Sequence, residues 1–496
     1  MLMTLIQKEI MHHILSARFA ALLLMCVLLI PLNLHINYHH YLQRQIDYQE
    51  QEVLKDEDTL EDANGKEGTG TKHRFSFTAK TATDPNFEVS KLILKPTPLS
   101  VFATGLESAL PRYLGMTRNG ITRGEASLST APIAFLLGHL DFVFVVSTVF
   151  SLLALLFTFD AVAGEREAGT LRITLANALP RDIFLWSKLI GGYLVFILPF
   201  LISLIIGLLV LVWQGFPLGE PDIFLRILCL IFVSLLYIAV FFALGAVISI
   251  YFDSSKTALI VAFTVWVFAV LILPRVGFLA AQIVAPTSTA ESVYREKTAR
   301  RSELRDALAA KRGKMMSEVF SEMMRESNVT PGSKTGAIAV FDSAHIDKVN
   351  EEMAPLEEEA RLKYRDLAAR LDRRYQQERK RQDTIGVNFS RITPTASFIF
   401  LATDTTQTGQ TKKNTYFQTG TRYYETLDSE IFSKMSEDPG SHIHKEDIPP
   451  PMPPPPLAEP ALEETLQHAA LDLLLLCFFA IVLTTVAFLK FFRMDI

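Results

Sequence analysis

Six long runs of apolar residues, separated by polar segments, constrain the fold of this 496-residue chain more than any other feature. A helix that spans a bilayer needs roughly 20 mostly apolar residues, and all six runs meet or approach that length. With 49% hydrophobic and 20% charged residues, the chain is neither a simple cytosolic globular protein nor a disordered one. The predicted spans are residues 18–36, 133–159, 189–213, 227–252, 257–284 and 468–490.

The first apolar run lies where a signal peptide would lie, but two features indicate an uncleaved span. The run is longer than a signal sequence needs, and Asn37 to His40 offer no cleavage site of small residues. The fold class that follows is a polytopic α-helical membrane protein with six transmembrane helices.

The orientation follows from the basic residues in the short flanks of the spans. The loop between spans three and four carries Glu220 and Asp222 and no basic residue before Arg226, so it is expected outside. Both termini are then cytoplasmic, and residues 37–132 and 285–467 form two large extracytoplasmic insertions. The basic flanking residues on the cytoplasmic side are Lys8, Arg18, Arg166, Arg172, Arg181, Lys188, Lys256, Lys490 and Arg493.

Residues 1–17 are predicted to form an amphipathic helix in the membrane interface before the first span. The alternative is a simple extension of that span. Apolar side chains recur at helical spacing, while Lys8 and Glu9 face away from them. The apolar positions are Leu2, Leu5, Ile6, Ile10, Ile14 and Leu15.

The first insertion, residues 37–132, is predicted to be a small α+β domain. Residues 38–60 read as a helix that continues the first span, and residues 61–72 as a loop rich in glycine and charge. Residues 74–80 and 89–94 alternate in polarity as strands do.

The second insertion, residues 285–467, is predicted to contain a helical hairpin. Apolar residues recur at helical spacing over residues 291–327 and 341–383, and Pro331 and Gly332 separate the two stretches. Pro355 is expected to kink or start part of the second helix. Between Glu291 and Asp383 there are 20 Lys and Arg against 18 Asp and Glu, which favours a solvated surface over a binding tract.

The remainder of the second insertion is predicted to be irregular. The threonine-rich residues 388–420 are expected to form a loop with short strands. Residues 449–460 contain the run PPPMPPPP, which indicates a stiff polyproline spacer before the last span.

Familiar catalytic and metal-binding patterns are absent from the sequence. There is no GxxxxGK[ST], HExxH, GxSxG or CxxC, and Cys26, Cys229 and Cys477 all lie in apolar runs. A net charge of −5 gives no indication of nucleic-acid binding. Imidazole is a common metal ligand, so a metal site is a minor alternative to ordinary interfacial or loop histidines. The clustered histidines are His35, His39, His40, His442 and His444.

The segment between the second and third spans, residues 160–188, carries the strongest functional signal. It reads GEREAGTL at Gly164, Glu165, Arg166, Glu167, Ala168, Gly169, Thr170 and Leu171. It is too polar to span and too short to be a domain. Its two glycines are expected to break an amphipathic stretch, and its three charges form a cluster that can dock on another protein. Residues 170–179 are expected to form a short helix against the membrane.

With this segment the chain resembles the permease subunits of ABC-2 type transporters, in the subgroup with large extracytoplasmic insertions and a domain of unknown function. In that family a GEREAGTL-like loop contacts a separate ATPase subunit, and the short helix transmits ATPase movement to the spans. The resemblance covers the amphipathic start, the six spans and the coupling loop. A softer similarity to the subgroup lies in residues 96–102 (PTPLSVF) and 394–397 (PTAS).

The resemblance implies a non-catalytic permease in the bacterial cytoplasmic (inner) membrane. It would work as a homodimer or heterodimer with two copies of a cytoplasmic ATPase, and an extracytoplasmic partner is a further option. ATP and Mg would be bound by that ATPase, with no cofactor and no metal in this chain. The expected activity is export or extraction of a substrate. The competing hypotheses are a mechanotransmission subunit that moves its outer domains without transport, and a membrane-anchored enzyme with its site in residues 285–467.

Overall fold

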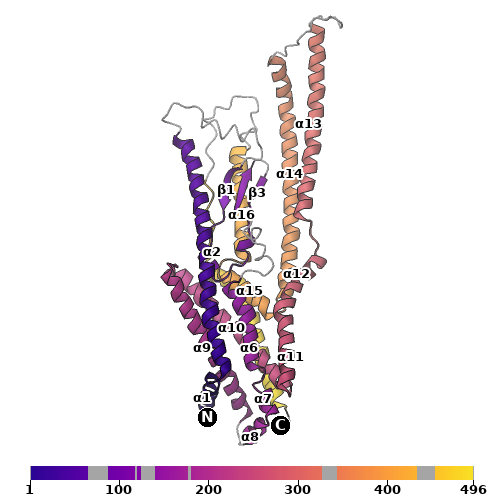
Figure 1. Ribbon diagram of the computed structural model, residues 1–496. Helices are drawn as coiled ribbons and strands as arrows, with labels where there is room; N and C mark the ends of the chain where they lie inside the picture. Colours follow the sequence, from indigo (N-terminus) through magenta and orange to yellow (C-terminus); the bar gives the residue numbers. More distant parts are fainter. Residues whose placement is uncertain are drawn as a thin grey trace.

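The computed structural model describes residues 2–64, 88–117, 120–124, 140–176, 180–326, 343–432 and 453–494. Within those ranges six helices are long and apolar enough to cross a membrane, which confirms the predicted fold class. Both termini lie at one end of the molecule, and the two insertions rise from the other end (Figure 1). The six candidate spans are Phe19–Glu52, Phe142–Glu167, Arg181–Trp213, Pro221–Tyr251, Ser255–Val284 and Leu462–Phe492.

Two of the six spans contain a π-helical turn within the α-helix. The second span contains a π-helical turn, η4, and the fifth contains another, η5. Bulky aromatic side chains fill the interior of the bundle, including Phe150, Phe196 and Phe200. The span helices are α2 (Ala17–Asn64), α5 (Phe142–Phe144) with η4 (Val145–Phe150) and α6 (Ser151–Thr158), α9 (Arg181–Trp213), α10 (Pro221–Tyr251), α11 (Ser255–Trp266) with η5 (Val267–Ile272) and α12 (Leu273–Val284), and α18 (Leu462–Phe492).

The N-terminal residues form a separate helix, α1 (Leu2–Ile14), that packs on α9. Ile6 is buried, and a side chain at Gly191 of α9 would meet the Glu9 side chain of α1, so the two helices are in close contact. The following helix α2 runs without a break from Ala17 to Asn64, as the predicted continuation of the first span requires.

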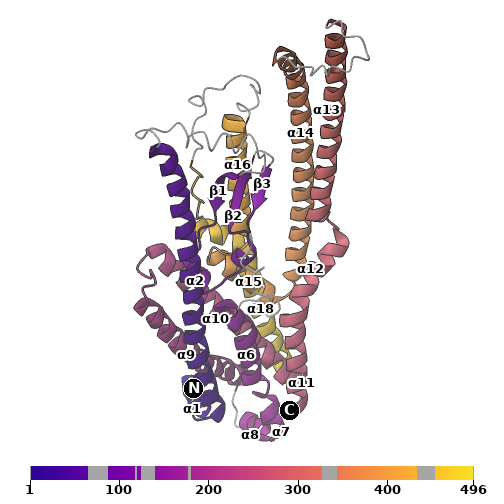
Figure 2. The same ribbon diagram turned by 45° about the horizontal axis from the view of Figure 1, so that its top comes forward.

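The described part of the first insertion contains a small antiparallel sheet of three strands in the order β1-β2-β3. The strands are β1 (Glu88–Ile93), β2 (Tyr113–Thr117) and β3 (Gly120–Arg123). Helix α16 (Gln410–Leu427), from the second insertion, lies against this sheet (Figures 1 and 2) and contributes Tyr416 and Tyr423 to a shared core. The predicted strand at 89–94 is confirmed, whereas the one at 74–80 lies outside the described residues.

The threonine-rich residues 388–420 are helical, so the prediction of a loop with short strands is wrong. They contain the end of α14, all of α15 (Pro394–Thr405) and the first half of α16. The hydroxyl of Thr393 accepts the Ala396 N–H at 3.3 Å and so caps α15, and Pro394 occupies its first position. Inside α15 the Thr405 hydroxyl donates to the Leu401 carbonyl at 2.7 Å, which satisfies the buried polar group. Burial between α10 and α18 therefore outweighs the weak helix propensity of threonine.

The predicted helical hairpin is present and consists of α13 (Ala290–Glu326) and α14 (Ser343–Ser390). The two helices are antiparallel, because Lys297 pairs with Asp372 at 2.6 Å while Arg312, further along α13, bonds Asn350 at 2.6 Å. Helix α14 has 48 residues and is therefore about 72 Å long. The second helix ends at Ser390, later than sequence periodicity indicated, and Pro355 lies inside it.

The base of the hairpin is packed on α12, the half of the fifth span that lies farther from the two termini. Ser390 Oγ donates to the Pro274 carbonyl at 3.0 Å, and Gln382 donates to the carbonyl of Ala285, just after α12, at 2.9 Å. A side chain at Gly277 would come within 2.7 Å of the Ser390 backbone nitrogen. The fifth span, α13 and α14 thus form one continuous arm (Figures 1 and 2).

Candidate functional site

The GEREAGTL segment lies at the end of the molecule that carries both termini and forms two short helices, α7 (Ala163–Glu167) and α8 (Thr170–Ala176) (Figure 1). Gly169 separates them with φ +72°, a conformation that favours glycine. The prediction that Gly164 also breaks the helix is wrong. Its N–H donates to the Asp160 carbonyl at 2.9 Å, and α7 passes through it. The end of the predicted helix 170–179 lies outside the described residues.

Glu165 faces inward and joins the segment to two other helices. Its carboxylate lies 2.7 Å from Nζ of Lys188 on α9, and the same ammonium group lies 3.2 Å from Glu9 on α1. Lys188 is only 11% exposed, so one cation bridges two carboxylates in a largely buried site. The second carboxylate oxygen of Glu165 has no hydrogen-bond partner among the described residues.

Arg166 and Glu167 join the segment to the start of the fifth span. Arg166 forms an ion pair with Asp253, in the turn between α10 and α11. Glu167 accepts the backbone N–H of Ser255, the first residue of α11, at 3.0 Å. A carboxylate in this position satisfies a free N–H group at the helix start and is favoured by the helix dipole.

Leu171 anchors α8 in a small apolar cluster at the same end of the bundle. Leu171 is 1% exposed and shares this cluster with Phe184 of α9, Ile250 of α10 and Phe491 of α18. The backbone N–H groups of Val162 and Ala163 also donate to Ser249 Oγ of α10, at 2.9 and 3.0 Å. The segment is therefore held by contacts with α9, α10, α11 and α18.

A continuous part of the segment stays exposed. It consists of the turn between α7 and α8 and the outer side of α8, where Ile173 is 68% exposed. Thr170 hydroxyl donates to the Glu165 carbonyl at 3.2 Å and braces the turn. The exposed residues are Glu167, Ala168, Gly169, Thr170, Arg172 and Ile173.

The predicted site residues thus divide into two groups. Glu165 and Leu171 are directed into the molecule, and Arg166 binds Asp253 near the surface, whereas Gly169 and Thr170 are exposed. That the three charges dock on a partner stays a prediction. Glu167 is exposed to solvent and also accepts a hydrogen bond from the first residue of α11. The sequence alone did not predict that Lys188, Glu9 or Asp253 would contact this segment. The one sequence feature that could have indicated such a contact is the lone charge of Lys188 at the start of an apolar run.

Among the described residues, His35, His39 and His40 form no metal site with neighbouring groups. His35 bonds Gln214 through Nδ1 and stacks edge-on with His39 at 4.6 Å between ring centroids. Within the described ranges no group of three or more His, Cys, Asp or Glu side chains is arranged to hold a metal ion. His442 and His444 lie outside those ranges.

The six candidate spans identify the chain as a multi-pass helical membrane protein. The chain belongs to the ABC-2 transporter family, because the model of the family described as ABC-2 family transporter protein matches residues 3–496. This confirms the family inferred from the GEREAGTL segment. The chain is accordingly a permease subunit of an ABC transporter, and its family implies an ATPase subunit as partner. A comparison with curated proteins gives no match.

Proposed function

We propose that this permease couples ATP hydrolysis by a separate cytoplasmic ATPase to export or extraction of a substrate, through the segment at residues 160–188. The exposed residues of α7 and α8 are the ATPase docking surface, and the inward residues carry its movement into the spans. ATP and Mg are bound by the ATPase, and this chain contributes no hydrolytic residue and no cofactor.

The observation that carries this proposal is the connection between the segment and the fifth span. Arg166 pairs with Asp253, and Glu167 holds the first N–H of α11. Helix α11 continues through η5 and α12 toward the hairpin. Glu165 makes a parallel connection to α9 and α1 through Lys188. A push on the exposed turn would therefore move three helices together.

The working unit in this proposal is a permease dimer, of equal or paired subunits, with two ATPases in the bacterial inner membrane. Both termini and the segment face the cytoplasm, and the hairpin and sheet lie outside. Closure of the ATPases on ATP favours one arrangement of the spans, and release favours the other. A ligand shifts such an equilibrium only through contacts that differ between the two states, and the docking segment supplies those contacts.

A second candidate function is mechanotransmission, in which ATPase work moves the hairpin without transport of a substrate. It is favoured by one specific observation, the packing of the hairpin base on α12 through Ser390 and Gln382. That contact joins the fifth span to α14, which is about 72 Å long, so that the two can act as a lever. Spin labels on the tips of two hairpins would report an ATP-dependent distance change in membranes that contain no substrate.

Purification of the tagged chain in mild detergent tests the main proposal, by asking whether an ATPase co-purifies and hydrolyses ATP. Ile173→Asp, on the exposed face of α8, should prevent co-purification. Arg166→Ala should keep the ATPase bound but make its hydrolysis independent of the permease. Arg493→Ala removes an exposed charge at the same end, outside the segment, and serves as the matched control. A stable permease that brings down no ATPase would refute the proposal.

A further inference from the structure

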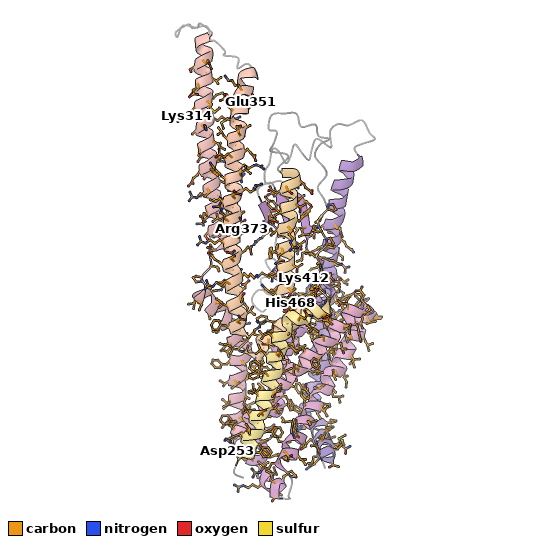
Figure 3. The ribbon with its side chains drawn as sticks, turned by 180° about the vertical axis from the view of Figure 1, so that it is seen from behind. Asp253, Lys314, Glu351, Arg373, Lys412 and His468 are labelled. Atoms are coloured by element: carbon orange, nitrogen blue, oxygen red, sulfur yellow. The ribbon has the colours of Figure 1, made fainter. Side chains whose placement is uncertain are left out.

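The charges of the α13–α14 hairpin are unevenly distributed along its length. In the lower half, residues 291–305 and 370–383, there are 11 Lys and Arg against 6 Asp and Glu. In the described upper half, residues 306–326 and 343–369, there are 8 against 11. Figure 3 shows Arg373 on the lower half and Lys314 and Glu351 near the tip. The arm is therefore basic near the spans and acidic far from them, although its total charge is almost balanced.

The basic residues closest to the spans are Arg379, Lys380 and Arg381 of α14. The neighbouring Gln382 bonds the carbonyl of Ala285, the residue that follows α12. Since a helix rises 1.5 Å per residue, the three charges lie within about 5 Å of the end of the fifth span. The polar headgroup layer on one side of a bilayer is about 5–7 Å thick. With the end of the fifth span taken as the edge of the hydrocarbon core, the three residues lie at the level of the lipid headgroups.

All three side chains are exposed, and among the described residues they make no hydrogen bond or ion pair. As consecutive residues of a helix they point in directions about 100° apart, so they cover the outward side of α14. The inward side is occupied by Glu378, which bonds Ser288, and by Gln382.

The acidic groups nearest to this basic surface are already engaged. Glu378 bonds Ser288 and Arg374, and the Ser288 N–H that it accepts keeps the pKa of its carboxyl below the usual value. Asp383 pairs with Lys413 of α16 at 2.9 Å. Asp372 pairs with Lys297. The excess positive charge is therefore not neutralised within the arm.

Exposed apolar side chains lie nearer to the spans than the three charges do. Ile283 is 83% and Val284 62% exposed at the end of α12, and Phe389 is 46% exposed at the end of α14. Apolar side chains at the edge of the hydrocarbon, with long basic side chains just above them, suit a membrane surface. Because Ile283 and Val284 end a candidate membrane span, a bilayer is the partner that this combination favours.

We propose that Arg379, Lys380 and Arg381 bind anionic phospholipid headgroups of the leaflet from which the hairpin emerges. The contact holds the base of the arm at the membrane. Each basic residue near an anionic surface strengthens binding about five-fold, and the effect weakens with salt.

The full chain in nanodiscs of mixed phosphatidylcholine and phosphatidylglycerol provides the test, without any ATPase. Spin-labelled phosphatidylglycerol should be immobilised in preference to spin-labelled phosphatidylcholine. Arg379→Gln combined with Lys380→Gln and Arg381→Gln should reduce this preference at least five-fold. The matched control removes the same charge near the tip, by Lys311→Gln, Arg312→Gln and Lys314→Gln, and should leave the preference unchanged.

Two further measurements test the lipid preference if the triple variant folds poorly. Arg379→Lys with Arg381→Lys retains the charge and should retain the preference, and high salt should abolish the preference in the unmodified chain. A preference that is independent of salt, or equal in the base variant and the unmodified chain, would overturn the proposal and leave the basic surface to a soluble acidic partner. The same would hold if the tip variant lost as much as the base variant.

Discussion

Replacement of Lys188 by methionine tests the bridge that joins the GEREAGTL segment to α9 and α1. Lys188 is 11% exposed, and its partners Glu9 and Glu165 are 18% and 28% exposed. Removal of one member of a buried ion pair costs about 3–5 kcal/mol, because the remaining charge loses its partner. The partial exposure of Glu165 places the expected cost at the lower end, about 3 kcal/mol for Lys188→Met.

Reversible unfolding in mixed micelles, followed by circular dichroism, measures this cost. Lys8→Met on α1 removes an exposed lysine and should change the free energy of unfolding by less than about 0.5 kcal/mol. The combination of Lys188→Met with Glu9→Gln and Glu165→Gln should recover most of the loss, because neutral groups of similar size often replace a buried ion cluster at little cost. The reasoning is refuted if Lys188→Met costs no more than Lys8→Met, or if the triple variant is as unstable as Lys188→Met.

Three further predictions concern the loop glycines and the base of the hairpin. Gly169→Ala should destabilise the segment by about 1 kcal/mol, because φ is +72° at this position. Gly164→Ala should be neutral or stabilising, because an added methyl group would meet no atom closer than 3.5 Å. Thermal unfolding of the two variants measures this difference. Gly277→Ala should cost about 1–3 kcal/mol, since its methyl group would meet the backbone of α14, and an unchanged melting temperature would contradict this. The Ser288 N–H lowers the pKa of the Glu378 carboxyl, so their hydrogen bond stabilises the hairpin base at neutral pH and is lost as the pH falls through the lowered pKa. The protection of the Ser288 amide against hydrogen exchange, measured relative to its intrinsic rate at the same pH, should then fall in acid, and Glu378→Gln should remove that pH dependence of the protection.

The spans could be predicted because hydropathy is a property of consecutive residues. An apolar run long enough to cross a bilayer has few alternatives to a helix, so the six candidate spans follow from composition alone. The hairpin could be predicted for a related reason, since its apolar residues recur at the helical period. Residues 388–420 were misassigned because threonine has a weak intrinsic preference, and burial of α15 against α10 and α18 decided its structure.

The candidate site was found from a short motif, but the roles of its residues depended on distant partners. Sequence alone marked Glu165 and Arg166 as a charge cluster, and chain order could not show that Lys188 and Asp253 meet them. Such pairs form only when helices far apart in the chain are packed together, because an ion pair requires its atoms to lie within a few ångströms. The sequence by itself therefore determined the membrane class, the family motif and the helical arm. The tertiary structure alone decided which residues of the motif face inward, which stay exposed, and which helices bind them.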